Sequence, residues 1–312
     1  MNRIAVIRTD RIGDLLMTMP AVGALRARYP DAVIDLIALK NAAPLLTGTP
    51  ELQTIYSYDP DEQPELFQII HWAGRLRANR YDAIIIFNPA RVFHAAAFLA
   101  GIPIRIGYSR KWGFLLNRTI ADTKASRLLH ESEYNLELVQ LLDANAKMAD
   151  LRLWISIENA ESARQLLKNN GVPEKSRPVA IHPWTSNPVK SWPMESFIQT
   201  ALALVRNGLP VILIGQPEGP CRTENRCLDL TGKIPLPLLP AVLNECAGLI
   251  SNDSGPAHIA AAVGTPLIVV APESHEPVLR RWSPLGKNQQ ILYSPTPEIV
   301  AHQAVLQFGI RS

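Results

Sequence analysis

The sequence contains few of the residues that mark specialised classes of protein. Its three cysteines, Cys221, Cys227 and Cys246, form no CxxC pair and have no metal-type spacing, which predicts reduced thiols in the cytosol and no metal site. Aromatic residues make up 6% of the chain, too few to indicate a base-stacking surface. Glycine, proline or charge interrupts every apolar run before it reaches the length needed to span a bilayer.

Charged residues are also sparse. They make up 19% of the chain and leave a net charge of +3, with no block of lysine and arginine that would neutralise many phosphates. A nucleic-acid partner is therefore not expected. The apolar part of residues 1–8 is too short for a signal peptide, which favours a cytoplasmic protein. Any contact with a membrane is expected to be peripheral.

The length of 312 residues predicts two domains of about 150 residues each. Strand-like apolar stretches alternate with stretches of helical periodicity in both halves, which predicts an α/β fold with domains at residues 1–155 and 156–312. Whether the last helix packs back on the first domain is left open. The predicted strands are residues 3–8, 32–39, 82–87, 104–107, 178–182, 209–215, 228–230, 247–250, 267–271 and 290–293, and the predicted helices include residues 15–28, 64–78, 92–100, 130–142, 158–169, 194–206 and 237–246.

A polar loop, residues 9–14, follows the first predicted strand at the edge where open α/β sheets bind ligands. Gly13 allows a tight turn, and Asp14 either caps the next helix or serves as a general base. The three-glycine spacing of a dinucleotide fingerprint is missing directly after the strand. A nicotinamide-dependent enzyme is therefore disfavoured.

Residues 252–266 (NDSGPAHIAAAVGTP) predict a helix that begins directly after a buried strand. We expect the backbone N–H groups of Gly255, Ala257 and His258 to point out of the carboxyl edge of the sheet, where they would form an anion site. Two interpretations stay open at this point. One is a pyrophosphate cradle in which Asp253 accepts hydrogen bonds from ligand hydroxyls, and the other is an ordinary capped helix with a hydrogen-bonded histidine.

A second polar loop, residues 183–193, carries the hydroxyl groups of Thr185 and Ser186 and the charge of Lys190. Its place after a predicted strand suits a second clamp on phosphate groups. The alternative is that Lys190 is an ordinary surface lysine. The case for a functional role depends on its position between two proline residues and a tryptophan.

Residues 105–127 form the most basic segment, with six basic residues against one acidic residue, Asp122. Such a segment is either a solvated loop or a basic patch that binds an anionic acceptor or a membrane surface.

Four motifs follow one another along nearly the whole chain: RTDRIGD at residues 8–14 with Pro20 and LRARYP at 25–30, IPIRIGY at 102–108, the loop from HP at 182–183 to KSWP at 190–193, and NDSGPAH at 252–258. Together they resemble the motif series of glycosyltransferase family 9, the ADP-heptose:lipopolysaccharide heptosyltransferases. The resemblance implies a GT-B fold, in which the parallel sheets of two Rossmann-like domains face each other across a cleft. The N-terminal domain would bind the acceptor and the C-terminal domain the nucleotide sugar.

The resemblance also implies an inverting, metal-independent transfer of heptose from ADP-L-glycero-D-manno-heptose. The acceptor would be the lipid A–core or another glycan, and no cofactor is expected besides the donor substrate. Asp14 matches the family's base, Lys190 the lysine that neutralises the leaving diphosphate, and Asp253 the carboxylate that holds sugar hydroxyls. The remaining donor-binding positions are Thr185, Ser186, Ser254, Gly255 and His258, and the acceptor-binding positions are Arg11, Arg105 and Arg110.

Two segments depart from the family pattern near the expected donor site. Trp184 stands where a small residue usually follows His-Pro, and residues 271–277 (APESHEP) replace the usual Gly-Pro-Thr-Asp-Pro. A family member that uses another nucleotide sugar or another polysaccharide acceptor is therefore an alternative. A GT-B sugar-nucleotide epimerase and a non-catalytic binding protein are further alternatives, although the presence of both Asp14 and Lys190 disfavours the latter.

Overall fold

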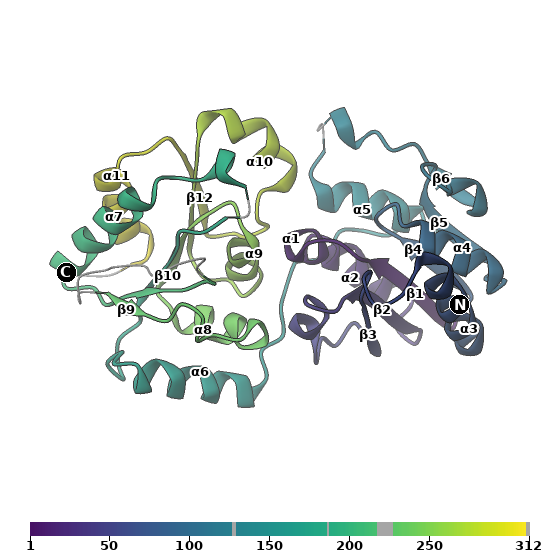
Figure 1. Cartoon of the computed structure of the whole chain (residues 1–312), viewed down its shortest axis with the longest axis horizontal. Helices are drawn as coiled ribbons and strands as arrows, with labels where there is room; N and C mark the ends of the chain where they lie inside the picture. Colours follow the sequence, from purple (N-terminus) through teal and green to yellow (C-terminus); the bar gives the residue numbers. More distant parts are fainter. Residues whose placement is uncertain (127–128, 186, 217–226, 310–312) are drawn as a thin grey trace. The chain divides into compact units, whose positions relative to one another are not determined.

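The computed structural model describes residues 1–126, 129–185, 187–216 and 227–309 of the chain (Figure 1). The chain divides into two compact units. The first consists of Met1–Leu151 with Arg280–Trp282, and the second of Arg152–Leu279 with Ser283–Ser312. No helix within the described ranges has both the length and the apolar character that crossing a bilayer requires.

The first unit contains a six-stranded parallel sheet with the strand order β3-β2-β1-β4-β5-β6. Both faces of its central strand are covered, since Ile4, Ala5, Val6 and Ile7 are all fully buried. This explains why the strand is a continuous apolar run rather than an alternating one. The strands are β1 (Arg3–Arg8), β2 (Val33–Leu39), β3 (Thr54–Tyr58), β4 (Ala83–Ile86), β5 (Ile104–Tyr108) and β6 (Arg118–Ile120).

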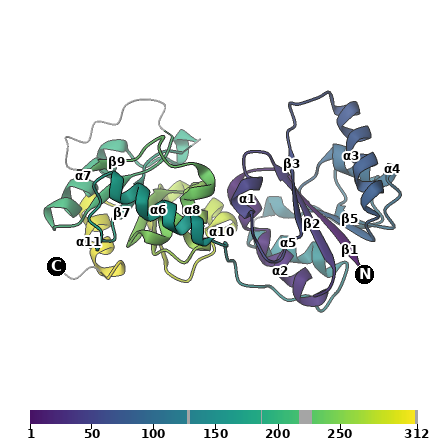
Figure 2. The same ribbon diagram turned by 90° about the horizontal axis from the view of Figure 1, so that it is seen from below.

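Helices cover the two faces of this sheet. One face packs against α3 (Glu65–Asn79) and α4 (Arg91–Leu99), whose buried side chains share a core with residues of β1, β2 and β4. On the other face α2 (Met19–Arg28) packs against α5 (Glu131–Gln140) (Figure 2). Because each helix follows a strand, the helices α3 and α4 begin at the carboxyl edge of the sheet.

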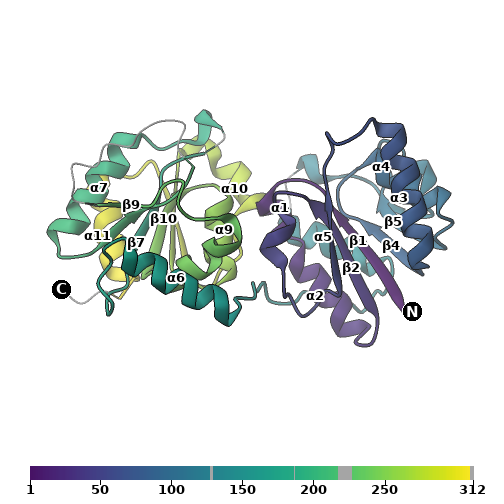
Figure 3. The ribbon, with the colours of Figure 1, turned by 60° about the horizontal axis from the view of Figure 1, so that its bottom comes forward.

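The second unit repeats this architecture, with the order β12-β11-β10-β7-β8-β9 in a six-stranded parallel sheet. Its strands are β7 (Val179–His182), β8 (Val211–Leu213), β9 (Leu228–Asp229), β10 (Gly248–Asn252), β11 (Leu267–Ala271) and β12 (Gln289–Tyr293). On one face α7 (Met194–Arg206) packs against α11 (Pro297–Gln307) around Phe197 and Leu204. The remaining helices are α8 (Leu239–Glu245), labelled in Figure 1, and α6 (Ile157–Asn169), α9 (Gly255–Ala262) and α10 (Glu276–Trp282), labelled in Figure 3. The last three residues of α10, Arg280–Trp282, cluster with the first unit.

Three local expectations need correction. The helix predicted over residues 15–28 is two helices, α1 (Ile12–Leu16) and α2, because Pro20 has no N–H to continue α1 and instead lies in the first turn of α2. The strands β3 and β6 were not predicted. The sequence on either side of β3 is rich in proline, which predicts a loop, and this hides the apolar and β-branched pattern of the strand. The helix α10 was also missed, because Pro277 follows directly after its first residue.

Both sheets have the same strand order, 3-2-1-4-5-6 in the numbering of their own unit. In such sheets the connections leave the first and fourth strands in opposite directions, which opens a crevice at the carboxyl ends of these two strands. In the first unit this point lies between β1 and β4, and in the second between β7 and β10. The predicted site residues Asp14, Lys190 and Asp253 all follow one of these four strands.

Candidate functional site

Arg8, the last residue of β1, is the centre of a buried hydrogen-bond network in the first unit. Only 2% of the residue is exposed. Its Nε donates to Asp10 Oδ1 at 2.7 Å, and its Nη2 donates to Asp14 Oδ1 at 3.0 Å. Its Nη1 donates to the carbonyl oxygen of Phe87 at 3.3 Å and to Asn135 Oδ1 at 3.2 Å. Arg8 therefore connects the loop after β1 to the core of the unit.

Glu131, the first residue of α5, holds Arg8 from the other side. Its Oε1 accepts from Arg8 Nη2 at 3.1 Å and from Lys124 Nζ at 2.5 Å. Its Oε2 accepts from Arg281 Nη2 at 2.6 Å; Arg281 is one of the three residues from 280 to 282 that cluster with this unit. Burial alone would raise the pKa of Glu131, but the positive charges of Arg8, Lys124 and Arg281 lower it below its ordinary value. Glu131 is thus a buried carboxylate that stays ionised.

Asp14 and Asp10 share the guanidinium of Arg8. The side chain of Asp14, in α1, is 21% exposed, and that of Asp10 is 30% exposed. Burial raises the pKa of Asp10 to about 6, and the nearby charge of Asp14 adds to the increase, while Arg8 opposes it. Asp14 combines a fixed orientation with access to solvent at the carboxyl edge of the sheet. This combination suits a general base.

In the second unit Asp253, directly after β10, is bound by two cationic or hydrogen-bonding side chains from other loops. Lys190 Nζ lies 3.1 Å from Asp253 Oδ2, and His275 Nε2 lies 3.0 Å from the same oxygen. His258 Nε2, from α9, lies 3.9 Å from Asp253 Oδ1. Burial would raise the pKa of Asp253, but Lys190 and His275 lower it below its ordinary value. The carboxylate therefore stays ionised and places Lys190 at the carboxyl end of β10.

The start of α9 is built on a buried histidine at the end of β7. His182 Nδ1 lies 3.2 Å from both Ser251 Oγ and Ser254 Oγ, and the two hydroxyl oxygens are 2.8 Å apart. Burial lowers the pKa of His182 to about 4, so the imidazole is neutral near pH 7. Ser254, the N-cap residue of α9, therefore has its hydroxyl turned towards the sheet.

The amide groups at this helix start differ in part from the expectation. The N–H groups of Ala257 and His258 donate to the carbonyl oxygen of Ser254, at 3.1 and 3.4 Å, rather than pointing out of the sheet edge. The cause is that α9 begins at Gly255, so these amides belong to its first hydrogen-bonded turn. The positive end of the helix dipole is still at Gly255, beside Asp253.

The side chain of Asn252 fixes the loop that carries Lys190. Its Oδ1 accepts from the backbone N–H of Trp192 at 2.8 Å, and its Nδ2 donates to the carbonyl oxygen of Pro183 at 2.6 Å. The two ends of the loop of residues 183–193 are thus tied to the residue that precedes Asp253. Within the loop, Thr185 Oγ1 accepts from the backbone N–H of Asn187 at 3.4 Å. Ser186 lies outside the described residues.

The predicted acceptor-binding arginines have different environments. Arg11, at the N-cap of α1, is exposed. Arg110 forms an ion pair with Asp122 at 2.7 Å and its side chain is 60% exposed. Arg105 donates to the backbone carbonyl oxygens of Leu115 and Ile102. Its guanidinium is thus held by the main chain.

One basic residue of the segment 105–127 does not belong to a basic surface. Lys124 is 8% exposed, pairs with Glu131 and lies 4.6 Å from the centre of the Tyr108 ring. Lys124 is a buried structural cation, so neither of the two alternatives for this segment, a solvated loop or a basic patch, describes this residue. Arg127 lies outside the described residues.

Sequence reasoning missed Arg8, Asp10, Glu131 and His275 as members of these two groups. Arg8 and Asp10 lie in the motif that contains Asp14, and a charged residue at the buried end of a strand is itself a signal. His275 lies in the segment that departs from the family pattern. Glu131 could not be found from the sequence, because nothing local marks it as a partner of Arg8.

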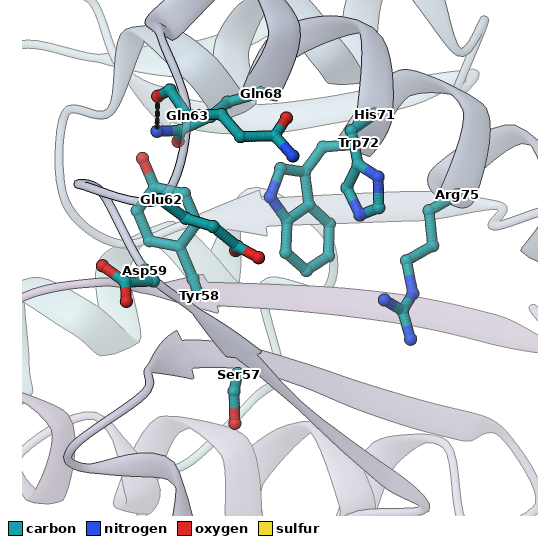
Figure 4. Close-up of a pocket in the computed structure, with 9 residues that line it drawn as sticks. All are labelled: Ser57, Tyr58, Asp59, Glu62, Gln63, Gln68, His71, Trp72 and Arg75. Atoms are coloured by element: carbon teal, nitrogen blue, oxygen red, sulfur yellow. Dashed lines mark hydrogen bonds between the residues drawn. The ribbon is translucent and has the colours of Figure 1, made fainter.

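A cavity of about 280 Å³ lies between the end of β3 and α3 (Figure 4). Trp72 and Arg75 line it from α3, and Asp59 and Glu62 line it from the preceding loop. The Oε1 atom of Gln68, which also lines the cavity, is buried and accepts no hydrogen bond from the residues that the structure describes. The lining of this cavity thus combines an aromatic ring with guanidinium, carboxylate and amide groups.

Two Rossmann-like units that each carry polar groups at the switch point of a parallel sheet are typical of GT-B glycosyltransferases. The structure is similar to that of a family 9 glycosyltransferase from Veillonella parvula, with a TM-score of 0.86, 19% identity and coverage of 98% of this chain and 97% of the other. It is also similar to that of the ADP-heptose lipopolysaccharide heptosyltransferase II of Escherichia coli, with a TM-score of 0.82, 21% identity and coverage of 99% and 98%. The two units thus have the GT-B fold.

The sequence comparison identifies the family. The model of glycosyltransferase family 9 (heptosyltransferase) matches residues 69–305. The lipopolysaccharide heptosyltransferase 3 of Escherichia coli K12 is 26% identical over 291 residues, which cover 87% of this chain and 83% of that protein. This chain belongs to glycosyltransferase family 9, as its motif series predicted.

Proposed function

We propose that this protein transfers heptose from ADP-L-glycero-D-manno-heptose to the inner core of lipopolysaccharide. Family membership supports the class of reaction, and the names of the two Escherichia coli relatives supply the donor and the acceptor. The observation that carries the proposal is the pairing of Lys190 with Asp253 at the start of α9. This pair brings a cation and a carboxylate to the start of a helix, where the cation and the helix N-terminus would bind a diphosphate and the carboxylate would accept hydrogen bonds from sugar hydroxyls.

In the second unit the donor would bind with its diphosphate at Lys190 and the N-terminus of α9. Both carry positive charge, and both stabilise the charge that builds up on the departing diphosphate. Asp253 would accept hydrogen bonds from sugar hydroxyls, and His275 adds a donor beside it. Thr185, Ser186 and His258 remain candidate contacts of the donor.

In the first unit Asp14 would act as the base. The acceptor hydroxyl oxygen forms a bond to the anomeric carbon, its proton passes to Asp14, and the bond from the anomeric carbon to the diphosphate breaks. A single displacement of this kind inverts the anomeric configuration. Lys190 and the helix dipole supply the positive charge for ADP release, so the mechanism requires no metal ion.

Arg11, Arg105 and Arg110 remain candidate contacts for anionic groups of the acceptor. The cavity beside Trp72 is a further candidate site, suited to an uncharged sugar because Asp59 and Glu62 would accept hydrogen bonds from its hydroxyls. The lipid-linked acceptor implies that the protein acts in the cytoplasm with a peripheral contact to the inner membrane.

Calorimetric titration with ADP, UDP, GDP and their sugar conjugates, in the presence of a metal chelator, tests this proposal. We expect ADP and ADP-heptose to bind preferentially, and heptose transfer to continue with chelator present. Preference for UDP or GDP would favour a family member with another donor, to which the departures at Trp184 and residues 271–277 point. Consumption of donor and a changed sugar without acceptor would instead indicate an epimerase.

A further inference from the structure

The indole of Trp184 lies against a glycine at the carboxyl edge of the second sheet. Gly215 is the second residue after β8, and a Cβ atom at this position would lie 2.6 Å from Trp184 Cε3 and 3.0 Å from Trp184 Cζ3. Any other residue would have to displace the indole. The φ angle of Gly215 is 138°, which residues with a Cβ atom rarely adopt. The six-membered ring of Trp184 is therefore held directly against the backbone of Gly215.

His182 contacts the indole from a second side. The centres of the His182 and Trp184 rings are 6.1 Å apart, and the two ring planes meet at 68° in an edge-on contact. His182 is 7% exposed and is hydrogen-bonded to Ser251 and Ser254, so its own position is fixed. The indole, in contrast, is only half-buried. Part of a firmly held aromatic ring is therefore open to solvent at the carboxyl edge of the sheet.

The strand register brings Trp184 close to the proposed donor site. β7 and β10 are neighbouring parallel strands (Figure 3). Trp184 is the second residue after β7, and Asp253 is the first residue after β10. Between them, Asn252 Nδ2 donates to the carbonyl oxygen of Pro183 at 2.6 Å. Trp184 and Asp253 therefore extend from neighbouring strand ends that a side-chain hydrogen bond holds together.

The strand order separates the two ends of a nucleotide sugar along this edge. His275, in the segment after β11, contacts Asp253 at 3.0 Å on one side of β10. Trp184 lies against the end of β8 on the other side, because the order of the strands is β11-β10-β7-β8. A diphosphate at Lys190 and the start of α9, with its sugar at Asp253, would therefore extend its nucleoside towards Trp184.

We propose that the base of the nucleotide donor stacks on the indole of Trp184. The inference rests on the proposed function, which places a diphosphate at Lys190 and the start of α9. Every base has an aromatic face, and one fixed ring is enough to bind it, so the low aromatic content of the chain is no obstacle. A purine offers a larger face than a pyrimidine. The contact therefore favours ADP and GDP over UDP.

Calorimetric titration with ADP and with inorganic pyrophosphate tests the proposal, because pyrophosphate carries the charges of the diphosphate but no base. We expect Trp184→Ala to weaken ADP binding by at least about fivefold and to leave pyrophosphate binding within about twofold. Lys190→Met should instead weaken the binding of both. Trp184→Phe keeps an aromatic ring, so its ADP affinity should lie between those of Trp184→Ala and the unaltered protein.

Trp154 offers a matched control in the same unit. It is 56% exposed, and Trp154→Ala should bind ADP within about twofold of the unaltered protein. Indole fluorescence gives a second measurement, because a stacked base quenches it. ADP should quench the emission of the unaltered protein and of Trp154→Phe, whereas pyrophosphate should not. Trp184→Phe should lose this quenching.

Two results would overturn the proposal. If Trp184→Ala binds ADP like the unaltered protein, the indole only fills the space beside Gly215. If it loses ADP and pyrophosphate binding equally, the indole supports the phosphate site and not the base. In either case the proposed function stands, provided that the unaltered protein transfers heptose from ADP-heptose.

The reverse outcome is distinguishable. If the unaltered protein prefers GDP to ADP, the proposed donor is wrong. A loss of GDP binding in Trp184→Ala, with pyrophosphate binding retained, would then still support stacking of the base on Trp184.

Discussion

Arg8 holds the carboxylate of Asp14 in one orientation: its Nη2 donates to Asp14 Oδ1 at 3.0 Å, while the rest of the guanidinium is anchored in the core. Glu131 and Asn135 of α5 supply that anchor. Asn135 also donates through Nδ2 to Thr18 Oγ1 at 3.2 Å, at the start of α2. The segment between β1 and α2, which carries Asp14 in α1, is therefore fixed from both ends.

The first prediction concerns the base itself. Asp14→Asn keeps the size and a hydrogen-bond acceptor but cannot take up the acceptor proton. We expect kcat to fall by about 100-fold or more. Because the proposed donor-binding residues all belong to the second unit, ADP affinity should change by less than about twofold. Single-turnover transfer and calorimetry measure the two quantities, and an unchanged rate would show that another group is the base.

The second prediction concerns Glu131, which anchors the guanidinium of Arg8. If Glu131 acts through Arg8 on Asp14, Glu131→Gln should lower kcat by roughly tenfold in the unaltered protein. In the Asp14→Asn background the same change should cost less than about threefold, because there is no longer a base to orient. Equal losses in both backgrounds would mean that Glu131 acts on the fold as a whole.

Asp35, another buried carboxylate of the first unit, provides the matched control for the Glu131→Gln variant. It is 1% exposed, pairs with Arg3 at 3.3 Å and accepts from the hydroxyl of Tyr81 at 2.6 Å, near the amino end of β1. Asp35→Asn should lower the free energy of unfolding by about 1–3 kcal/mol and leave kcat unchanged. A loss of kcat in Asp35→Asn would indicate that general destabilisation lowers kcat in this variant and in Glu131→Gln.

The third prediction concerns the phosphate clamp. Lys190→Met removes the charge beside Asp253 while keeping most of the side-chain volume. The loss of a charge-assisted contact, about 1.5–3 kcal/mol, should weaken ADP binding by roughly 10- to 150-fold. Lys168→Met is the control, since its side chain is 57% exposed and pairs with Glu174 on the surface. If both variants bind ADP like the unaltered protein, Lys190 does not bind the diphosphate and its pairing with Asp253 is structural.

The fourth prediction concerns the pH dependence of folding. The pKa of His182 falls to about 4 in the folded protein, from an ordinary value of about 6.5 in the unfolded chain. Between these values the unfolded chain binds the additional proton, so stability is full above about pH 6.5 and falls as the pH drops towards 4. The limiting slope is about 1.4 kcal/mol per pH unit.

His182→Asn keeps a hydrogen-bonding group that does not titrate, so urea unfolding of this variant should show a shallower decline of stability from pH 6.5 to 4. A smaller decline should remain, because burial also lowers the pKa of His94 to about 4. An identical pH dependence in the variant would mean that His182 is not buried in its neutral form.

The sequence alone predicted most of the elements and the sheet edge that carries the candidate site residues. Apolar runs and capping residues are local signals, which is why the strands β1, β7 and β11 and the helices α3 and α7 lie where their patterns predict. The same logic located Asp14, Lys190 and Asp253, since polar residues that directly follow buried strands must gather at the carboxyl edge of a parallel sheet. The family motifs added the class of reaction.

Only the tertiary structure decided which distant side chains meet. Arg8 and Glu131 are 123 residues apart in the chain, and His275 and Asp253 are 22 residues apart. Lys124 lies in a segment that reads as a solvated basic loop, yet packing against Tyr108 and Glu131 buries it. Hydrophobic periodicity specifies which face of an element is buried, whereas the pairing of charges depends on how the elements pack in three dimensions, and no local pattern encodes that.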